Sequence, residues 1–340
     1  MTEILLTIFF ISVLLFFLGS GIWVALSMIG VSAIGMMLFT SRPVGDAMAT
    51  TIWGTSSSWT LTALPLFVWM GEILFRTKLS ENLFKGLSPW MQNLPGGLIH
   101  VNVVGCALFA AISGSSAATV ATVGKMSIPE LRKRNYPEKI LLGSLAGSGT
   151  LGLLIPPSII LIIYGVAVQE SIAKLFIAGI IPGIMIALIF MSYVIIWSLI
   201  NKKSMPKILE EYSFLEKIKR SKQLLPIIIL ILAVIGSIYT GIATATEAAS
   251  LGVVGALILS YFQKSLTLNT FKSSLLGATK TSCMIAFILA GSTFLSLAMG
   301  FTGLPRNLAL WIQNMDLSPY VLIFVLMIFY IILGMFLDGI

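Results

Sequence analysis

A short polar stretch at residues 113–119, Ser-Gly-Ser-Ser-Ala-Ala-Thr, lies inside an otherwise apolar segment from about residue 97 to residue 126. Apolar flanks of this kind belong in lipid or in the core of a membrane protein, so the stretch is interpreted as a break in a membrane-embedded helix. Non-helical backbone is tolerated at membrane depth only where it is buried in protein or lines a polar cavity, because each unpaired N–H or C=O in hydrocarbon costs several kcal/mol. The stretch therefore predicts a binding site.

A second break is expected at residues 147–158, where Pro156 and Pro157 follow one another inside an apolar segment. Proline has no N–H and clashes with the preceding turn, so two in succession interrupt a helix. Where two such breaks meet, the ends of half-helices offer unpaired carbonyls to a cation, and the starts of half-helices offer N–H groups to an anion. This chemistry suits Na⁺ together with a carboxylate substrate, and it needs no buried charge.

The residues expected to bind the ion or the substrate are those of the two breaks: Ser113, Gly114, Ser115, Ser116, Thr119, Gly149, Gly152, Pro156, Pro157 and Ser158. Na⁺ itself is expected at the hairpin tip and the Pro-Pro break, at Ser113, Ser115, Ser116, Gly149 and Gly152. Both features have a structural alternative, which is close helix packing through small residues for 113–116 and a kink for the prolines. Their occurrence together favours the binding site.

Two carboxylates are further candidates. Asp338, next to Gly339, lies in an apolar segment, where a carboxylate is costly and usually functional. Glu247 lies at the outer start of a span and is either a gate or coupling group or a helix-start carboxylate favoured by the helix dipole. With one histidine and two distant cysteines, the sequence has no metal-ligand cluster and no Ser-His-Asp pattern. We therefore expect no enzyme activity and no organic cofactor.

The composition predicts the elements that position these residues. The chain is 57% hydrophobic and 10% charged, with a mean hydropathy of +1.02, so we expect an all-α polytopic membrane protein. The expected spans are residues 4–19, 22–39, 61–74, a re-entrant hairpin at about 97–129, a broken helix at about 140–168, 172–200, 224–239, 246–262, 282–299 and 320 onward. Residues 46–58, 80–92 and 304–313 are shorter and amphipathic, which is typical of the membrane interface.

The positions of the basic residues predict the orientation. If residues 97–129 enter and leave the membrane on one side, all lysines and arginines except Arg42, Lys174 and Arg306 fall on that same side. Such an asymmetry marks the basic side as cytoplasmic and puts the N-terminus outside, in a bacterial inner membrane. The net charge of +8 is then a topology signal, with the lipid bilayer and its anionic headgroups as neighbours and no nucleic acid partner.

The chain also carries a weak internal repeat at an offset of about 220 to 225 residues. It pairs Gly21 with Gly241, Gly35 with Gly255, Phe67 with Phe287, Gly71 with Gly291, residues 79–83 with 304–308, and Gly114 with Gly339. An odd number of membrane crossings separates the aligned residues of the two copies, which predicts that the second copy is inverted in the membrane. The expected organisation is a first repeat at 1–200, a cytoplasmic linker at 201–223, and a second, incomplete repeat at 224–340 that ends at a second hairpin tip.

These residues carry a family resemblance. The run at 113–119, the Leu151-Gly152-x-x-Ile155-Pro-Pro-Ser run, Thr-Glu-Ala-Ala at 246–249 and the Gly-x-x-Leu-Asp-Gly pattern at 334–339 resemble the large membrane subunit, DctM, of tripartite ATP-independent periplasmic (TRAP) transporters. The resemblance covers essentially the whole chain, although family members continue past the second hairpin, so the chain is expected to be truncated.

The resemblance implies an elevator-type secondary transporter driven by Na⁺. It also implies a small membrane subunit of about four helices and a periplasmic binding protein that delivers an organic acid such as a dicarboxylate or sialic acid. Two alternatives remain open at this point. One is an Na⁺/dicarboxylate or anion transporter that works without a binding protein, and the other is a membrane-embedded enzyme or scaffold.

Overall fold

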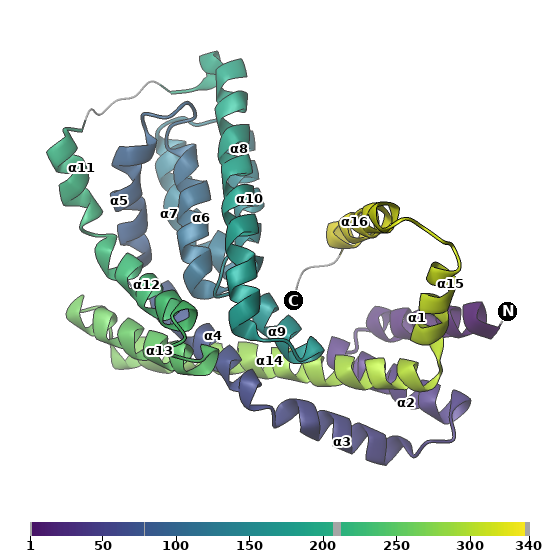
Figure 1. The fold of residues 1–340 in the computed structure, drawn as a ribbon. Helices are drawn as coiled ribbons and strands as arrows, with labels where there is room; N and C mark the ends of the chain where they lie inside the picture. Colours follow the sequence, from purple (N-terminus) through teal and green to yellow (C-terminus); the bar gives the residue numbers. More distant parts are fainter. Residues whose placement is uncertain (1, 78, 207–211, 337–340) are drawn as a thin grey trace. The chain divides into compact units, whose positions relative to one another are not determined.

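The computed structural model describes residues 2–77, 79–206 and 212–336 (Figure 1). Every regular element in these ranges is a helix, as the composition predicts. The chain divides into two compact units, Met1–Trp59 with Cys283–Ile340, and Thr60–Ser282. We call them the terminal unit and the central unit.

The terminal unit is built from helices of both ends of the chain. They are α1 (Thr2–Gly19), α2 (Val24–Phe39), α3 (Val44–Ser56), α15 (Leu304–Gln313) and α16 (Pro319–Phe336), together with the second half of α14 (Leu268–Phe301). Met36 of α2 is fully buried against Phe294 and Ala298 of α14. The two helices approach closely at Gly291, where an added Cβ would lie 2.8 Å from the backbone oxygen of Ala25.

The central unit contains the remaining helices. They are α4 (Ala63–Phe75), α5 (Leu79–Met91), α6 (Ile99–Ser113), α7 (Ser116–Lys133), α8 (Glu138–Gly149), α9 (Ile159–Val168), α10 (Ile172–Ile200), α11 (Phe214–Ser221), α12 (Leu225–Tyr239), α13 (Ala245–Phe262) and the first half of α14, with 3₁₀ turns at Thr150–Leu153 and Lys202–Ser204. A further 3₁₀ turn, Trp59–Thr62, contains the chain boundary between the two units. Helix α4 packs on α13.

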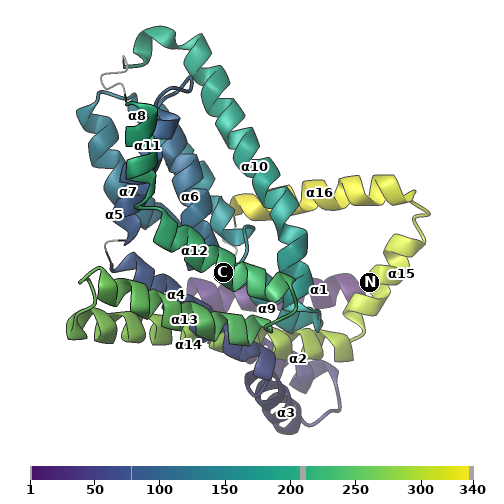
Figure 2. The same ribbon diagram turned by 60° about the vertical axis from the view of Figure 1, so that its left-hand side comes forward.

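Helices α6 and α7 form the predicted hairpin, which lies alongside α5 and α8 (Figures 1 and 2). Two buried clusters hold it against its neighbours: Ile99 packs with Ile140 and Val194, and Val103 packs with Ala110 and Leu151. At the base of the hairpin the N–H of Leu98 donates a hydrogen bond to Tyr136 Oη at 3.1 Å. Burial raises the pKa of the Tyr136 phenol above its ordinary value, so the hydroxyl stays neutral.

Most predicted spans correspond to helices, with three differences in extent. The span expected at 282–299 is the second half of the 34-residue α14, because no proline interrupts residues 268–301, and Lys272 and Lys280 are therefore helical. Helix α7 continues through Pro129 to Lys133 instead of ending at the proline. The linker at 201–223 contains α11, which begins with a capping box between Ser213 and Glu216.

By length and composition, three helices in the described part are able to cross a membrane on their own, namely α10, α13 and α14. The number rises to five if each of two bent helix pairs counts as one span. Apolar stretches of α1, α2, α6, α9 and α16 are shorter. Two of these short helices are halves of divided apolar segments. Helix α6 is one arm of the hairpin, and α9 is the second part of the broken helix.

The inverted repeat stays a prediction, but one pair of its aligned residues has the same local structure. Gly21 follows α1 with φ +77° and Gly241 follows α12 with φ +72°. In both turns the glycine N–H donates to the carbonyl three residues earlier, in Leu18 and Ile238 respectively. A residue with a side chain is strained at such a φ, so both turns favour glycine.

We predict that Gly291→Ala destabilises the protein by about 1–3 kcal/mol, because the new methyl group would overlap backbone of Ala25 and the two helices must separate. Thermal unfolding in detergent measures this. Gly300→Ala on the same helix is the control, since its Cβ would meet nothing within 4 Å. Equal melting temperatures for the two variants would contradict the close approach.

Candidate functional site

The tip of the hairpin consists of only two non-helical residues. Helix α6 ends at Ser113 and α7 begins at Ser116, so Gly114 and Ser115 form the break. Gly114 has φ +59°, in the left-handed region that favours glycine. Ser115 caps α7, and its Oγ accepts a hydrogen bond from the N–H of Ala118 at 3.5 Å. The predicted break is confirmed at Gly114 and Ser115, whereas residues 116–119 form the first turn of α7.

The second break is also confirmed. Helix α8 ends at Gly149, a 3₁₀ turn covers Thr150–Leu153, and α9 starts only at Ile159. Pro156 and Pro157 are joined by a cis peptide bond, and both are buried together with Ser158. The Ser158 Oγ donates to the carbonyl of Leu153 at 2.6 Å, which satisfies one of the backbone oxygens that the break leaves without a helical partner.

The two breaks are in direct contact. The N–H of Ile159, at the start of α9, donates to the Gly114 carbonyl at 3.4 Å. An added Cβ on Gly114 would lie 3.1 Å from the Pro157 oxygen, and one on Gly152 would lie 3.1 Å from the backbone of Ser115. Glycine at both positions therefore allows backbone to meet backbone. The structure confirms the expected meeting of the hairpin tip and the Pro-Pro break.

Further along the hairpin, Gly149 faces α7, where an added Cβ would overlap Val120. The same added Cβ would lie 3.7 Å from the carbonyl oxygen of Ser116, so Gly149 lies about one helical turn from the tip contact. The structure thus brings all ten break residues expected at the site into one region of the central unit.

The hydroxyl groups at the tip already bond to one another. Thr119 is fully buried, and its Oγ1 donates to the Ser115 carbonyl at 2.7 Å, which also accepts the Thr119 N–H at 3.0 Å. The Oγ of Ser113 lies 2.8 Å from Thr119 Oγ1. The buried Ser113 and Thr119 therefore hold the turn together, and the Ser115 carbonyl is engaged within the hairpin. Na⁺ coordination by these residues stays a prediction.

Sequence reasoning missed two glycines of α10 that support the second break. An added Cβ on Gly179 would lie 2.8 Å from the Leu154 oxygen, and one on Gly183 would lie 2.8 Å from the Ile155 side chain. The Gly-x-x-x-Gly spacing in an apolar helix is the signal that could have found them, because it lets another segment approach the helix backbone. The break thus lies between the hairpin tip and α10.

The two carboxylate candidates have different outcomes. Glu247 forms a capping box at the start of α13: its Oε2 accepts the Thr244 N–H at 2.8 Å, and its own N–H donates to Thr244 Oγ1 at 3.3 Å. This is the helix-start alternative, and a role as gate or coupling group stays a prediction. Asp338 and Gly339 lie outside the described residues. Within those residues, no group of three or more His, Cys, Asp or Glu is placed to hold a metal ion.

We predict that Thr119→Val destabilises the protein by about 1–2 kcal/mol, because the buried Ser113 hydroxyl loses the shortest of its hydrogen bonds and the Ser115 carbonyl loses one donor. Thermal unfolding tests this. Thr122→Val is the matched control, since Thr122 is also buried but donates only to Ala118 in the preceding turn of its own helix. An equal loss in both variants would show that the tip network adds no stability.

We further predict that Gly152→Ala lowers stability by about 1–3 kcal/mol, because its methyl group would push the Ser115 backbone away. Gly143→Ala in α8 is the control, since Gly143 is exposed and has open space around its Cβ position. Thermal unfolding compares the two. A Gly152 variant as stable as the Gly143 variant would argue against tight contact between the breaks.

The family model described as "Tripartite ATP-independent periplasmic transporter, DctM component" matches residues 9–340. The chain is 32% identical over 308 residues to the C4-dicarboxylate TRAP transporter large permease protein DctM of Pseudomonas aeruginosa, which covers 90% of this chain and 71% of that protein.

Two further relatives are named for other substrates. The sialic acid TRAP transporter large permease protein SiaM of Vibrio cholerae is 31% identical over 325 residues, or 95% of this chain and 75% of that protein. The ectoine/5-hydroxyectoine TRAP transporter large permease protein UehC of Ruegeria pomeroyi is 30% identical over 343 residues, or 98% and 77%. Together with the family match, they show that this chain belongs to the DctM family of TRAP transporter large permeases.

Proposed function

We propose that this TRAP permease carries out Na⁺-coupled uptake of a small organic acid. The contact between the hairpin tip and the Pro-Pro break is the observation that supports the proposal. It brings Gly152 against the backbone of Ser115 and Ser116, beside the hydroxyl and carbonyl oxygens of the hairpin tip, and neutral oxygens of this kind are hard ligands that suit Na⁺. The proposed ligands are neutral, so the site needs no buried carboxylate.

The helix starts at the two breaks support the proposed class of substrate. Helices α7 and α9 both begin at the breaks, at Ser116 and Ile159, and helix N-termini favour anions. Several relatives are named for organic acids, including C4-dicarboxylate, sialic acid and 2,3-diketo-L-gulonate. A carboxylate beside a bound Na⁺ is consistent with both sets of observations.

We propose the partners and the membrane arrangement from the family. The permease works with a small membrane subunit of about four helices and with a periplasmic binding protein that delivers the substrate. It is a multi-pass protein of the bacterial inner membrane with its N-terminus outside, and it moves the hairpin and the broken helix together in an elevator motion. The relatives named above are all TRAP permeases, which favours this arrangement over a transporter without a binding protein and over a membrane enzyme or scaffold.

The test is uptake into proteoliposomes that contain the permease and its small subunit. The binding protein and a radiolabelled substrate, such as a C4-dicarboxylate or sialic acid, are added outside with or without an inward Na⁺ gradient. We expect uptake that needs both the binding protein and the gradient. Uptake without the binding protein would overturn the tripartite proposal, and uptake that is unchanged when Na⁺ is replaced by K⁺ would overturn Na⁺ coupling.

The same assay tests the ion site. Ser115→Ala is expected to raise the Na⁺ concentration for half-maximal uptake several-fold, because one ligand oxygen at the tip is lost. The control is Ser192→Ala on α10, an exposed serine whose Oγ donates to Leu188 in the preceding turn. A Ser115 variant with the Na⁺ dependence of the control would remove Ser115 from the ion site.

A further inference from the structure

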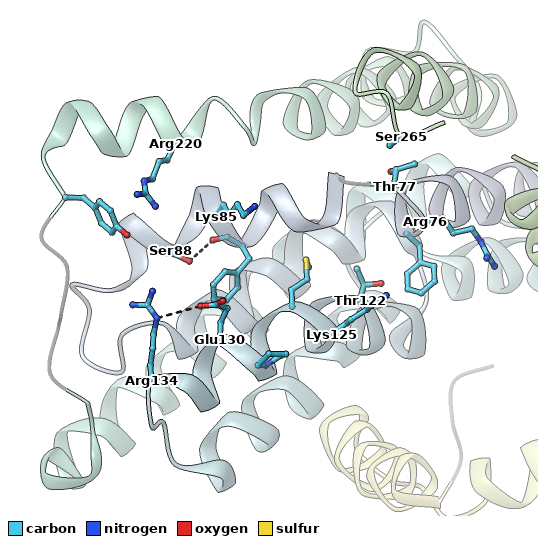
Figure 3. A pocket seen from close by; sticks show the side chains of 15 residues that line it. Arg76, Thr77, Lys85, Ser88, Thr122, Lys125, Glu130, Arg134, Arg220 and Ser265 are labelled. Carbon is cyan, nitrogen blue, oxygen red and sulfur yellow. Dashed lines mark hydrogen bonds and ion pairs between the residues drawn. The ribbon is translucent and has the colours of Figure 1, made fainter. Parts of the chain in front are cut away.

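A large basic cavity lies in the central unit, along the part of α7 that leads away from the hairpin tip. It has a volume of about 940 Å³ and is lined by residues of α4, α5, α7 and α11 (Figure 3). From Ser116 at the tip, α7 rises by roughly 9 Å, at 1.5 Å per residue, before it reaches Thr122, the first residue of α7 in the cavity lining. The cavity is therefore separate from the tip contact.

The walls of the cavity are strongly positive. Five cationic side chains from four helical segments line it: Arg76, Lys85, Lys125, Arg134 and Arg220. Figure 3 shows Arg134 and Arg220 together at one end and Arg76 at the other. Among the lining residues that the structure describes, Glu130 is the one carboxylate beside these five cations.

Two of these cations, Arg76 and Arg134, form ion pairs with carboxylates of the described residues. Glu130 Oε2 lies 3.9 Å from Arg134 Nε, and Glu72, outside the lining, accepts a bond from Arg76 Nε at 2.8 Å. The Arg220 guanidinium stacks over the Tyr212 ring at 4.3 Å, an arrangement that keeps its charge. Lys125 is exposed and forms no ion pair within the described residues. The charge that remains is set to attract an anion.

The surroundings of the cavity have the character of a membrane interface. Helix α11 leaves Phe214 and Leu215 exposed, at 66% and 77%, while its basic residues include Arg220 in the cavity wall. Trp90 of α5 donates its Nε1 hydrogen to Ser221 at 2.7 Å and packs edge-on against Phe214. A helix with basic residues and exposed apolar residues beside a tryptophan is typical of the headgroup region of a bilayer.

We propose that this cavity is an oxyanion-binding site whose ligand is a phosphate group. Arginine guanidinium groups match phosphate oxygens in paired hydrogen bonds, and lysine adds charge without a fixed geometry. Phosphate can reach the site in the headgroup of an anionic lipid or free in solution. The site is distinct from the ion and substrate site proposed above and does not depend on Na⁺ coupling.

Native mass spectrometry of the purified permease tests the proposal, with phosphatidylglycerol as the lipid probe, phosphatidylcholine as the zwitterionic reference and inorganic phosphate as the free probe. The variant is K125Q/R220Q, which removes two cations from the cavity. The matched control is K202Q/K203Q, which removes two exposed lysines that do not line the cavity. Melting temperatures show whether each variant folds. If K125Q/R220Q does not fold, the single substitution Lys125→Gln is tested in its place.

We expect K125Q/R220Q to weaken phosphatidylglycerol binding about 30-fold, from about fivefold for each cation near an anionic membrane surface, with little change in K202Q/K203Q. Phosphatidylcholine should bind all forms weakly. A second outcome is that inorganic phosphate binds with the same dependence on Lys125 and Arg220, while phosphatidylglycerol binds no more strongly than phosphatidylcholine. That result would support the site and assign free phosphate as its ligand. Equal effects of the two double substitutions on both probes would overturn the proposal.

Discussion

Backbone groups need hydrogen-bond partners wherever a helix is interrupted away from water. This need governs the arrangement of the central unit. Each interruption leaves N–H and C=O groups without helical partners, and leaving them unpaired in an apolar environment costs several kcal/mol each. The structure pairs them across the two breaks and within them: Ile159 donates to Gly114, Thr119 donates to Ser115, and Ser158 donates to Leu153. The breaks are therefore held in mutual contact, and the site is a consequence of that contact.

Close approach of backbones requires residues without side chains, and this requirement recurs in both units. In the terminal unit Gly291 allows α14 to meet α2 at Ala25, and in the central unit Gly252 of α13 faces Met70 of α4. Lipid is as apolar as a leucine side chain, so helices in a membrane gain little from hydrophobic burial against one another and depend on tight packing instead. Small residues at helix contacts supply that packing.

The distribution of charge follows from the same energetics. The hairpin tip is built from hydroxyl and carbonyl oxygens and needs no permanently buried charge. The cationic side chains Lys125 and Arg134 lie further along α7, beside α5 and α11, where the helices have interfacial character. One helix thus joins a neutral site at its start to a basic cavity near its end.

The helical membrane class, the family and the positions of both breaks could be predicted from the sequence alone. These depend on local properties, such as the missing N–H of Pro156 and Pro157 and the length of apolar runs. The fold was needed to show that Ser113 and Thr119 bond to each other, that Gly179 and Gly183 contact the second break, and that cations from several helices line one cavity. Backbone preference depends on neighbours along the chain, whereas the partner of a side chain depends on which distant segments the fold brings beside it.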